Sequence, residues 1–230
     1  MKTISFYEFK SQFKSIKAFL IIALLLVVTL GSAKLFQNFQ VQTAELGFEG
    51  MYIAGLVALL TIAGPLFVSA LSHDSINRET HTRTMRFLVT KVSRTEIVIG
   101  KFIGMFAFWV ICLAVVSLAL IPFSGTFYVR EYLVILLFMA YFIGLFLFLS
   151  TVITKPSLSL FVGTVLAIGL PVIGFWGLVD NSNVVIRFVN YVMPYFYFDE
   201  TTGYLGYLVL PAMTALFVAA SCWLVKGRDL

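Results

Sequence analysis

The sequence predicts an all-α integral membrane protein in which six transmembrane helices form a single domain across residues 1–230. Two observations point to this fold class. Hydrophobic residues make up 60% of the chain and charged residues 12%, whereas an ordinary soluble domain has about 45–50% and about 25%. The apolar residues also form six continuous runs, each close to the about 20 helical residues that cross a bilayer core. Because backbone groups in lipid must bond within their own segment, we expect these runs to be helices.

The first seventeen residues predict an amphipathic helix that lies in the membrane interface. Its apolar residues share one helical face, and they are Phe6, Phe9, Phe13 and Ile16. Lysines flank this face, and they are Lys10, Lys14 and Lys17. Such a helix would bury its rings at the headgroup level and attract anionic lipid, which makes the membrane lipid an expected partner. An unstructured basic tail is the alternative.

The six runs predict the transmembrane segments. They cover residues 18–36, 52–72, 102–122, 132–154, 159–179 and 205–225. Lys34, near the end of the first run, is the one Asp, Glu, Lys or Arg that they contain. Gly31-Ser32-Ala33 resembles a secretory cleavage site, but the patterned leader favours a first span that stays uncleaved.

The distribution of Lys and Arg predicts the orientation of the chain. Thirteen of the 16 basic residues fall in one alternating set of connections and termini, while the other set holds Lys34, Arg130 and Arg187. Cytoplasmic loops keep an excess of Lys and Arg. We therefore expect a multi-pass protein of a bacterial cell membrane with both termini in the cytoplasm.

Several classes of chemistry have no support in the sequence. Ion-coupled transporters usually carry titratable residues inside the membrane, and these runs contain almost none. There is no Gly-x-x-x-x-Gly-Lys-Ser/Thr phosphate loop, so we expect no ATP binding, no catalytic residue and no cofactor on this chain. His73 next to Asp74 is interpreted as a solvated pair in a cytoplasmic loop rather than a metal site. Cys112 and Cys222 lie in apolar runs, so neither a disulfide nor a metal is expected.

The basic residues do not predict nucleic-acid binding, because they border apolar runs instead of gathering on one accessible face. Small residues four apart predict close helix packing, and they are Gly100 with Gly104, Ala140 with Gly144, and Gly163 with Ala167. Possible gating or kink positions are Gly64, Pro65, Gly169, Pro171, Gly174, Gly177 and Pro194.

The cytoplasmic loop 73–101 is the most informative segment. It mixes six basic residues with three acidic ones and carries a central apolar cluster of Met85, Phe87, Leu88 and Val89. An apolar cluster in a polar loop is typical of a docking element for another protein. A short helix packed back on its own bundle or on headgroups is the alternative.

At this loop the sequence resembles the permease subunits of ABC-2 type (type V) ABC transporters. The matching positions are Arg78-Glu79, Thr84-Met85-Arg86-Phe87-Leu88-Val89, Val92-Ser93-Arg94 and Gly100-Lys101, with departures at Arg83, Arg86 and Lys91. The resemblance implies a coupling helix between the second and third spans. It assigns ATPase coupling to Arg78, Glu79, Thr84, Met85, Arg86, Phe87, Leu88, Val89, Ser93 and Arg94.

The same resemblance implies a function and partners. A separate cytoplasmic ABC ATPase would bind ATP and Mg, a second copy or a homologous permease would complete the pathway, and the complex would export an amphipathic peptide, drug or lipid. The stretch 180–204, interrupted by Pro194, would form an outer lid, although an interfacial aromatic loop is the alternative. A secondary transporter or channel, a membrane-embedded enzyme and a non-transporting assembly protein remain rival functions.

Overall fold

The structure is a computed structural model that describes residues 2–43, 51–82, 84–85, 90, 92–179, 189, 191–198 and 203–227. Every regular element in these residues is a helix. The elements are α1 (Lys2–Phe13), α2 (Ile16–Thr43), α3 (Met51–Ser72), α4 (Asn77–His81), α6 (Arg94–Leu118), α7 (Ile121–Ser124), α8 (Val129–Val152), α9 (Pro156–Val179), the 3-10 helix η2 (Pro194–Phe198) and α11 (Gly203–Lys226).

The six predicted spans are confirmed, because six helices within the described residues are long and apolar enough to cross a membrane. The largest difference in helix ends is at α6, which begins at Arg94 rather than near residue 102. A capping box sets this start: the Ser93 side chain accepts from the Glu96 backbone N–H, and the Glu96 carboxylate accepts from the Ser93 N–H. The third span therefore carries about two extra turns at its start.

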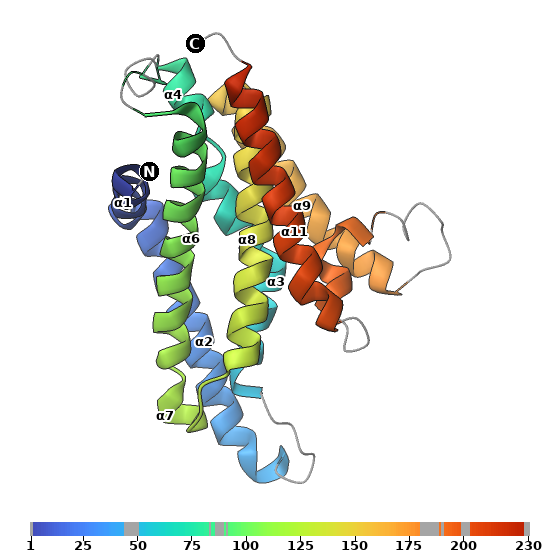
Figure 1. The fold of residues 1–230 in the computed structure, drawn as a ribbon. Coiled ribbons are helices and arrows are strands. Elements are labelled where there is room, and N and C mark those ends of the chain that lie inside the picture. The colour runs from blue at the N-terminus through green and yellow to red at the C-terminus, as the bar shows by residue number, and fades with distance from the viewer. Residues whose placement is uncertain are drawn as a thin grey trace.

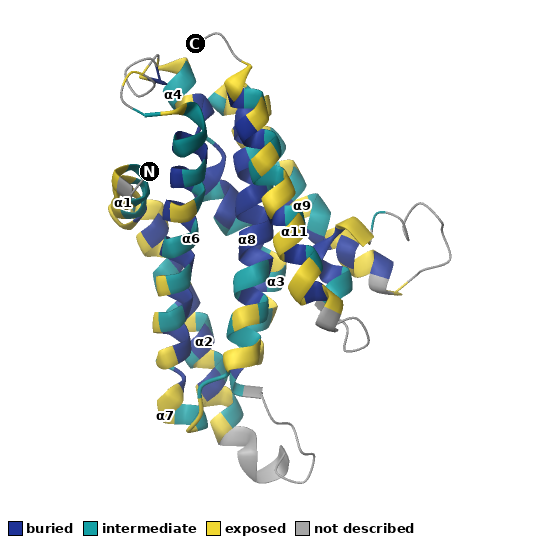
Figure 2. Cartoon of the chain, in the orientation of Figure 1, coloured by how far each residue is buried: buried dark blue, intermediate teal, exposed yellow. Residues whose placement is uncertain are grey.

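The centre of the bundle is α8. Buried residues make up 61% of its apolar window, against 22% for α2, and its rings Phe138, Phe142 and Phe146 are fully buried. Its neighbours are α3, α6, α9 and α11. Figure 2 shows buried residues where α6 and α8 face the interior and exposed residues along the outer side of α11. The outer faces are apolar, as expected for helices in contact with lipid.

Glycines lie at three of the helix contacts in the bundle, and two of these contacts leave no room for a Cβ. A Cβ on Gly104 of α6 would lie 2.7 Å from the Ser5 carbonyl oxygen of α1, and a Cβ on Gly163 of α9 would lie 2.8 Å from Ser69 Oγ of α3. At Gly144 of α8 a Cβ would meet α11 at 3.4 Å, an ordinary contact. Close approach through small residues was predicted for each of these glycines.

Helix α1 crosses the bundle instead of running along it. Figure 1 shows α1 viewed down its axis while α2, α6 and α8 run the length of the molecule. Phe13 packs on Phe108 of α6, whereas Phe6 and Ile16 are exposed. This placement suits an interfacial helix, and its contact with lipid stays a prediction.

Candidate functional site

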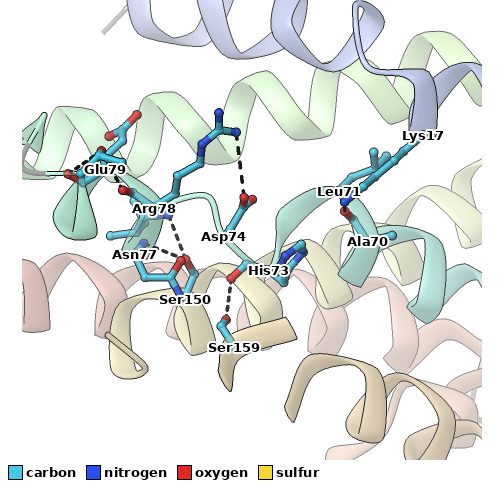
Figure 3. Close-up of polar contacts among 12 residues, drawn as sticks. Lys17, Ala70, Leu71, His73, Asp74, Asn77, Arg78, Glu79, Ser150 and Ser159 are labelled. Carbon is cyan, nitrogen blue, oxygen red and sulfur yellow. Dashed lines mark hydrogen bonds and ion pairs between the residues drawn. The ribbon is translucent and has the colours of Figure 1, made fainter. Parts of the chain in front are cut away.

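The cytoplasmic extension predicted after the second span begins with a break between α3 and α4, shown in Figure 3. His73 lies in this break, is 7% exposed, and donates from Nδ1 to the Ser69 carbonyl at 2.9 Å. The His73 carbonyl accepts a hydrogen bond from Ser159 Oγ of α9 at 2.5 Å. Asp74 instead lies 4.0 Å from Arg78. The predicted solvated pair of His73 with Asp74 is therefore wrong, because α9 covers the histidine and helps to hold the break.

The start of α4 is fixed by the end of α8. Ser150 Oγ accepts from the backbone N–H groups of Ile76 at 2.9 Å and Asn77 at 3.2 Å, and Asn77 Nδ2 donates to the Ile153 carbonyl at 3.1 Å. These N–H groups belong to the first turn of a helix, where no intrahelical acceptor exists. A displacement of α4 would therefore act on the ends of both α8 and α9.

A charged joint links α4 to α1 and α6. We use this name for Glu8, Gln12, Glu79 and Lys101. Lys101 Nζ donates to Glu79 Oε1 at 2.7 Å and to Glu8 Oε2 at 3.2 Å, and the lysine side chain is 5% exposed. Gln12 Nε2 donates to Glu8 Oε1 at 3.5 Å and to the Leu71 carbonyl at 3.2 Å. One buried cation thus joins α1, α4 and α6.

The close packing of α1 on α6 explains how Glu8 reaches Lys101. Gly104 lies one helical turn beyond Lys101 on the same face, and a Cβ there would meet both the Ser5 carbonyl oxygen and Glu8 Cβ at 2.7 Å. Because backbone cannot move aside as a flexible side chain does, glycine is required for this approach. The result is a short bond between oppositely charged groups that are largely removed from water.

An aromatic joint lies deeper in the bundle. We use this name for Thr61, Phe138, Gly174 and Tyr195. The Tyr195 hydroxyl of η2 donates to the Thr61 carbonyl of α3 at 2.8 Å. That carbonyl lies four residues before Pro65, which has no N–H to offer. Tyr195 therefore supplies the hydrogen bond that the proline removes from the helix.

The Tyr195 ring is held as tightly as its hydroxyl. The residue is 2% exposed, and its ring packs edge-on against Phe138 at 5.3 Å. A Cβ on Gly174 of α9 would lie 2.7 Å from Tyr195 Cγ. Burial raises the pKa of the Tyr195 hydroxyl above its ordinary value, so the phenol keeps the proton that it donates.

Comparison with protein families decides the class of this chain. A family model described as ABC-2 family transporter protein matches residues 4–218. The chain belongs to the ABC-2 family. The match includes both joints, the first five apolar helices and α11 as far as residue 218, and it identifies the chain as a membrane component of a transporter. No curated protein matches the chain.

The structure brings together only some of the coupling residues predicted for this ABC-2 chain. Ser93 caps α6, and Arg94 Nη1 donates to the Val225 and Lys226 carbonyls at the end of α11, at 3.3 and 2.9 Å. Glu79 belongs to the charged joint. Thr84 Oγ1 lies 3.0 Å from Thr82 Oγ1. Arg78, Glu79 and Thr84 border one cavity, whereas Ser93 and Arg94 do not.

The predicted apolar cluster is only partly described. Met85 is 1% exposed and belongs to the core, which differs from our expectation that it faces a partner. Arg86, Phe87, Leu88 and Val89 lie outside the described residues. Arg78 is well exposed, with 71% of its side chain accessible, and it is the described coupling residue best placed for an external contact.

The predicted kink positions have different surroundings. Pro65 and Pro171 lie inside α3 and α9 without ending either helix, and Pro194 begins η2. A Cβ on Gly64 would meet Met139 Sδ at 3.2 Å, whereas one on Gly169 would meet nothing within 4 Å. The intrahelical hydrogen bond that Pro65 cannot make is replaced by the bond from the Tyr195 hydroxyl. In this conformation α3 is therefore held against η2 near Pro65.

Sequence reasoning missed Glu8, Ser150 and Tyr195 as positioning residues, and it placed Lys101 at the end of the cytoplasmic loop 73–101. One signal for Lys101 was available: Ser93 and Glu96 have capping-box spacing, which starts the helix at Arg94 and places Lys101 inside it. No pattern marks Glu8 or Ser150, because their partners are distant in the chain. Within the described residues, no group of His, Cys, Asp and Glu has the geometry to hold a metal ion.

Proposed function

We propose that the chain is the membrane-spanning permease subunit of an ATP-driven ABC exporter. A separate cytoplasmic ATPase subunit binds ATP and Mg, and this chain couples its hydrolysis to export of an amphipathic peptide, drug or lipid. Membership of the ABC-2 family and the six apolar helices support this proposal. The apolar spans favour an amphipathic substrate over a small ion, since an ion would require charged or polar partners inside the membrane.

The observation that carries the proposal is the way α4 is attached. Lys101 connects it to α1 and α6, while Ser150 and Asn77 connect it to the end of α8. A short helix held through buried polar contacts can transmit a displacement to several spans at once, since packed elements move as rigid bodies. This attachment is what an element that receives force from an ATPase requires.

The segment from Arg78 to Arg94 forms the coupling element in this proposal. Arg78 and the apolar residues Phe87, Leu88 and Val89 contact the ATPase, whereas Glu79, Ser93 and Arg94 hold the segment in position. Met85, which is buried in the core, anchors the segment to the helix bundle. A second copy or a homologous permease supplies the other half of the pathway, and the two halves rock between inward and outward access, with Gly64, Pro65, Gly169, Pro171 and Pro194 at the points of bending.

The proposed orientation places both termini and the coupling element in the cytoplasm, because thirteen of 16 basic residues lie on that side. Single cysteines at Glu45, Ser124 and Asn183 should react with a membrane-impermeant maleimide added to intact cells. A cysteine at Thr84 should react after the cells are opened. Labelling of Thr84→Cys in intact cells would show that the chain has the opposite orientation in the membrane.

Replacement of Leu88 tests the coupling element. Leu88→Asp would place a charge against an apolar pocket of the ATPase, and burying an unpaired carboxylate is costly. We expect copurification with the proposed ATPase subunit to fall at least tenfold, with loss of transport. Val129→Asp is the matched control, because Val129 is exposed in the first turn of α8, where an acidic residue is tolerated.

The control should copurify normally at equal membrane expression. Equal ATPase recovery and transport with wild type and Leu88→Asp would show that this segment does not couple the two subunits. ATP hydrolysis by the purified chain alone would contradict the division of labour between permease and ATPase.

A further inference from the structure

A cavity separates α1 from α4 at the charged joint. Its volume is 760 Å³, and residues from α1, the break after α3, α4 and α6 surround it. This volume lies within the range of about 300–1,000 Å³ typical of small-ligand sites. Lys101 and Glu79 border it, so the joint that fixes α4 is also one wall of the cavity.

Two residues that border the cavity each carry a buried oxygen without a hydrogen-bond partner among the described residues. One is Ser75 Oγ, on a residue that is 7% exposed and borders the cavity. The other is Glu79 Oε2, the carboxylate oxygen that Lys101 does not contact. Buried polar atoms are nearly always satisfied in native structures. A carboxylate oxygen accepts and never donates, so the missing partner is a donor.

The charges on the wall specify a cationic donor. Lys101 carries one positive charge and is shared by Glu8 and Glu79, which leaves one negative charge in excess. Arg78 lies 4.0 Å from Asp74 with 71% of its side chain exposed, so its guanidinium keeps donors for an anion. A positively charged N–H group would therefore satisfy Glu79 Oε2 and balance the excess charge at the same time.

The other walls indicate where this cation comes from. Tyr7 of α1 borders the cavity, and both Tyr7 and its neighbour Phe6 are largely exposed on a helix that crosses the bundle. Lys17 and Gln12 bind the last carbonyls of α3, at Ala70 and Leu71. The cavity thus lies where the second span ends, and exposed aromatic residues at that level are typical of the lipid headgroup region.

We propose that this cavity binds the headgroup of an ethanolamine phospholipid. The ammonium donates to Glu79 Oε2 and Ser75 Oγ, and the phosphate pairs with Arg78, whose exposed guanidinium borders the same cavity. A choline headgroup has no N–H and therefore cannot donate to either oxygen. A glycerol headgroup has no cation to balance the carboxylate. This site does not depend on the substrate or on the orientation assigned above, and it shares only Arg78 with the proposed ATPase contact.

The test is native mass spectrometry of the purified full-length chain titrated with dioleoyl lipids that carry ethanolamine, choline or glycerol headgroups. We expect about tenfold tighter binding of the ethanolamine lipid than of the choline lipid, as a charge-assisted hydrogen bond predicts. Glu79→Gln should abolish this preference while Lys101 keeps Glu8 as a partner. Ser75→Ala should reduce it about two- to tenfold.

Two controls separate a binding role from a structural one. Ser72→Ala removes another buried hydroxyl without a partner in the described part of the chain, and Ser72 does not border the cavity. Glu131→Gln removes a carboxylate from the first turn of α8, away from the cavity. Both variants should keep the wild-type preference for ethanolamine.

Equal binding of ethanolamine and choline lipids, or an unchanged preference in Glu79→Gln and Ser75→Ala, would overturn the proposal. Tightest binding of the glycerol lipid would show an anion site instead. If soluble phosphoethanolamine competes fully but the lipid shows no headgroup preference, the ligand is a free amine. If the lipids bind equally and Ser75→Ala weakens only ATPase copurification, the cation is a partner's side chain and the lipid proposal fails.

Discussion

The charged joint and the aromatic joint attach short helices to the same bundle by different forces. The charged joint holds α4 through one lysine and two carboxylates at the end of α3. The aromatic joint holds η2 through a hydroxyl and a packed ring near the middle of α3. The desolvation penalty of an ion pair is small near water and headgroups, whereas in the apolar interior an uncharged donor costs less free energy to bury than a charged one. The depth of each joint therefore sets its chemistry.

The comparison predicts that the charged joint is the more sensitive to loss of one member. Lys101→Met leaves Glu8 and Glu79 buried beside each other without a cation. Removal of one member of a buried ion pair costs about 3–5 kcal/mol. Chemical unfolding in mixed micelles should show a loss of this size for Lys101→Met.

The matched control removes all three charges. Lys101→Met combined with Glu8→Gln and Glu79→Gln leaves no unpaired charge and should recover most of the lost unfolding free energy. If the single and triple variants are equally unstable, shape rather than charge holds α4, and the contrast between the joints fails.

The aromatic joint should respond most to a change of shape. Gly174→Ala introduces a Cβ that would lie 2.7 Å from Tyr195 Cγ, and overpacking of this kind costs about 1–3 kcal/mol. Gly169→Ala in the same helix is the control, because its Cβ would meet nothing within 4 Å. Tyrosine fluorescence and unfolding in micelles should separate the two variants. Equal stability would show that η2 shifts freely against α9.

Loss of the hydroxyl alone should have the smallest effect. Tyr195→Phe keeps the ring and leaves the Thr61 carbonyl without its donor, at a cost of about 1 kcal/mol. Pro65→Ala restores an N–H that can bond to the same carbonyl within the helix. In a double-mutant cycle, Tyr195→Phe should therefore cost less in the Pro65→Ala background. Additive effects would mean that Tyr195 does not replace the bond missing at Pro65.

The spans could be predicted because each is a local property of the chain. A run such as 52–72 contains enough apolar residues to cross the membrane whatever its neighbours do, and α3 covers Met51–Ser72. Helix ends are predictable where the sequence contains a capping box, as at Ser93 and Glu96. His73 was misjudged because burial by α9 is not visible in the residues around it.

The residue contacts that form the two joints could not be predicted from the sequence, for a physical reason. Lys101 meets Glu8 across 93 residues and Tyr195 meets Thr61 across 134. A single sequence carries no periodic pattern for such contacts, because they depend on how the helices pack. The carbonyl freed by Pro65 was foreseeable from the chain, but its donor was not.

The bond from Tyr195 to Thr61 also has a consequence for biosynthesis. Thr61 is translated 134 residues before Tyr195, so the ribosome completes spans two to five while that carbonyl still lacks its final donor. Until η2 arrives, water or the insertion machinery must solvate an open peptide group at membrane depth. A nascent chain that stops before Tyr195 therefore keeps a polar defect in its second span, which gives membrane quality-control proteases a feature that distinguishes unfinished chains from complete ones.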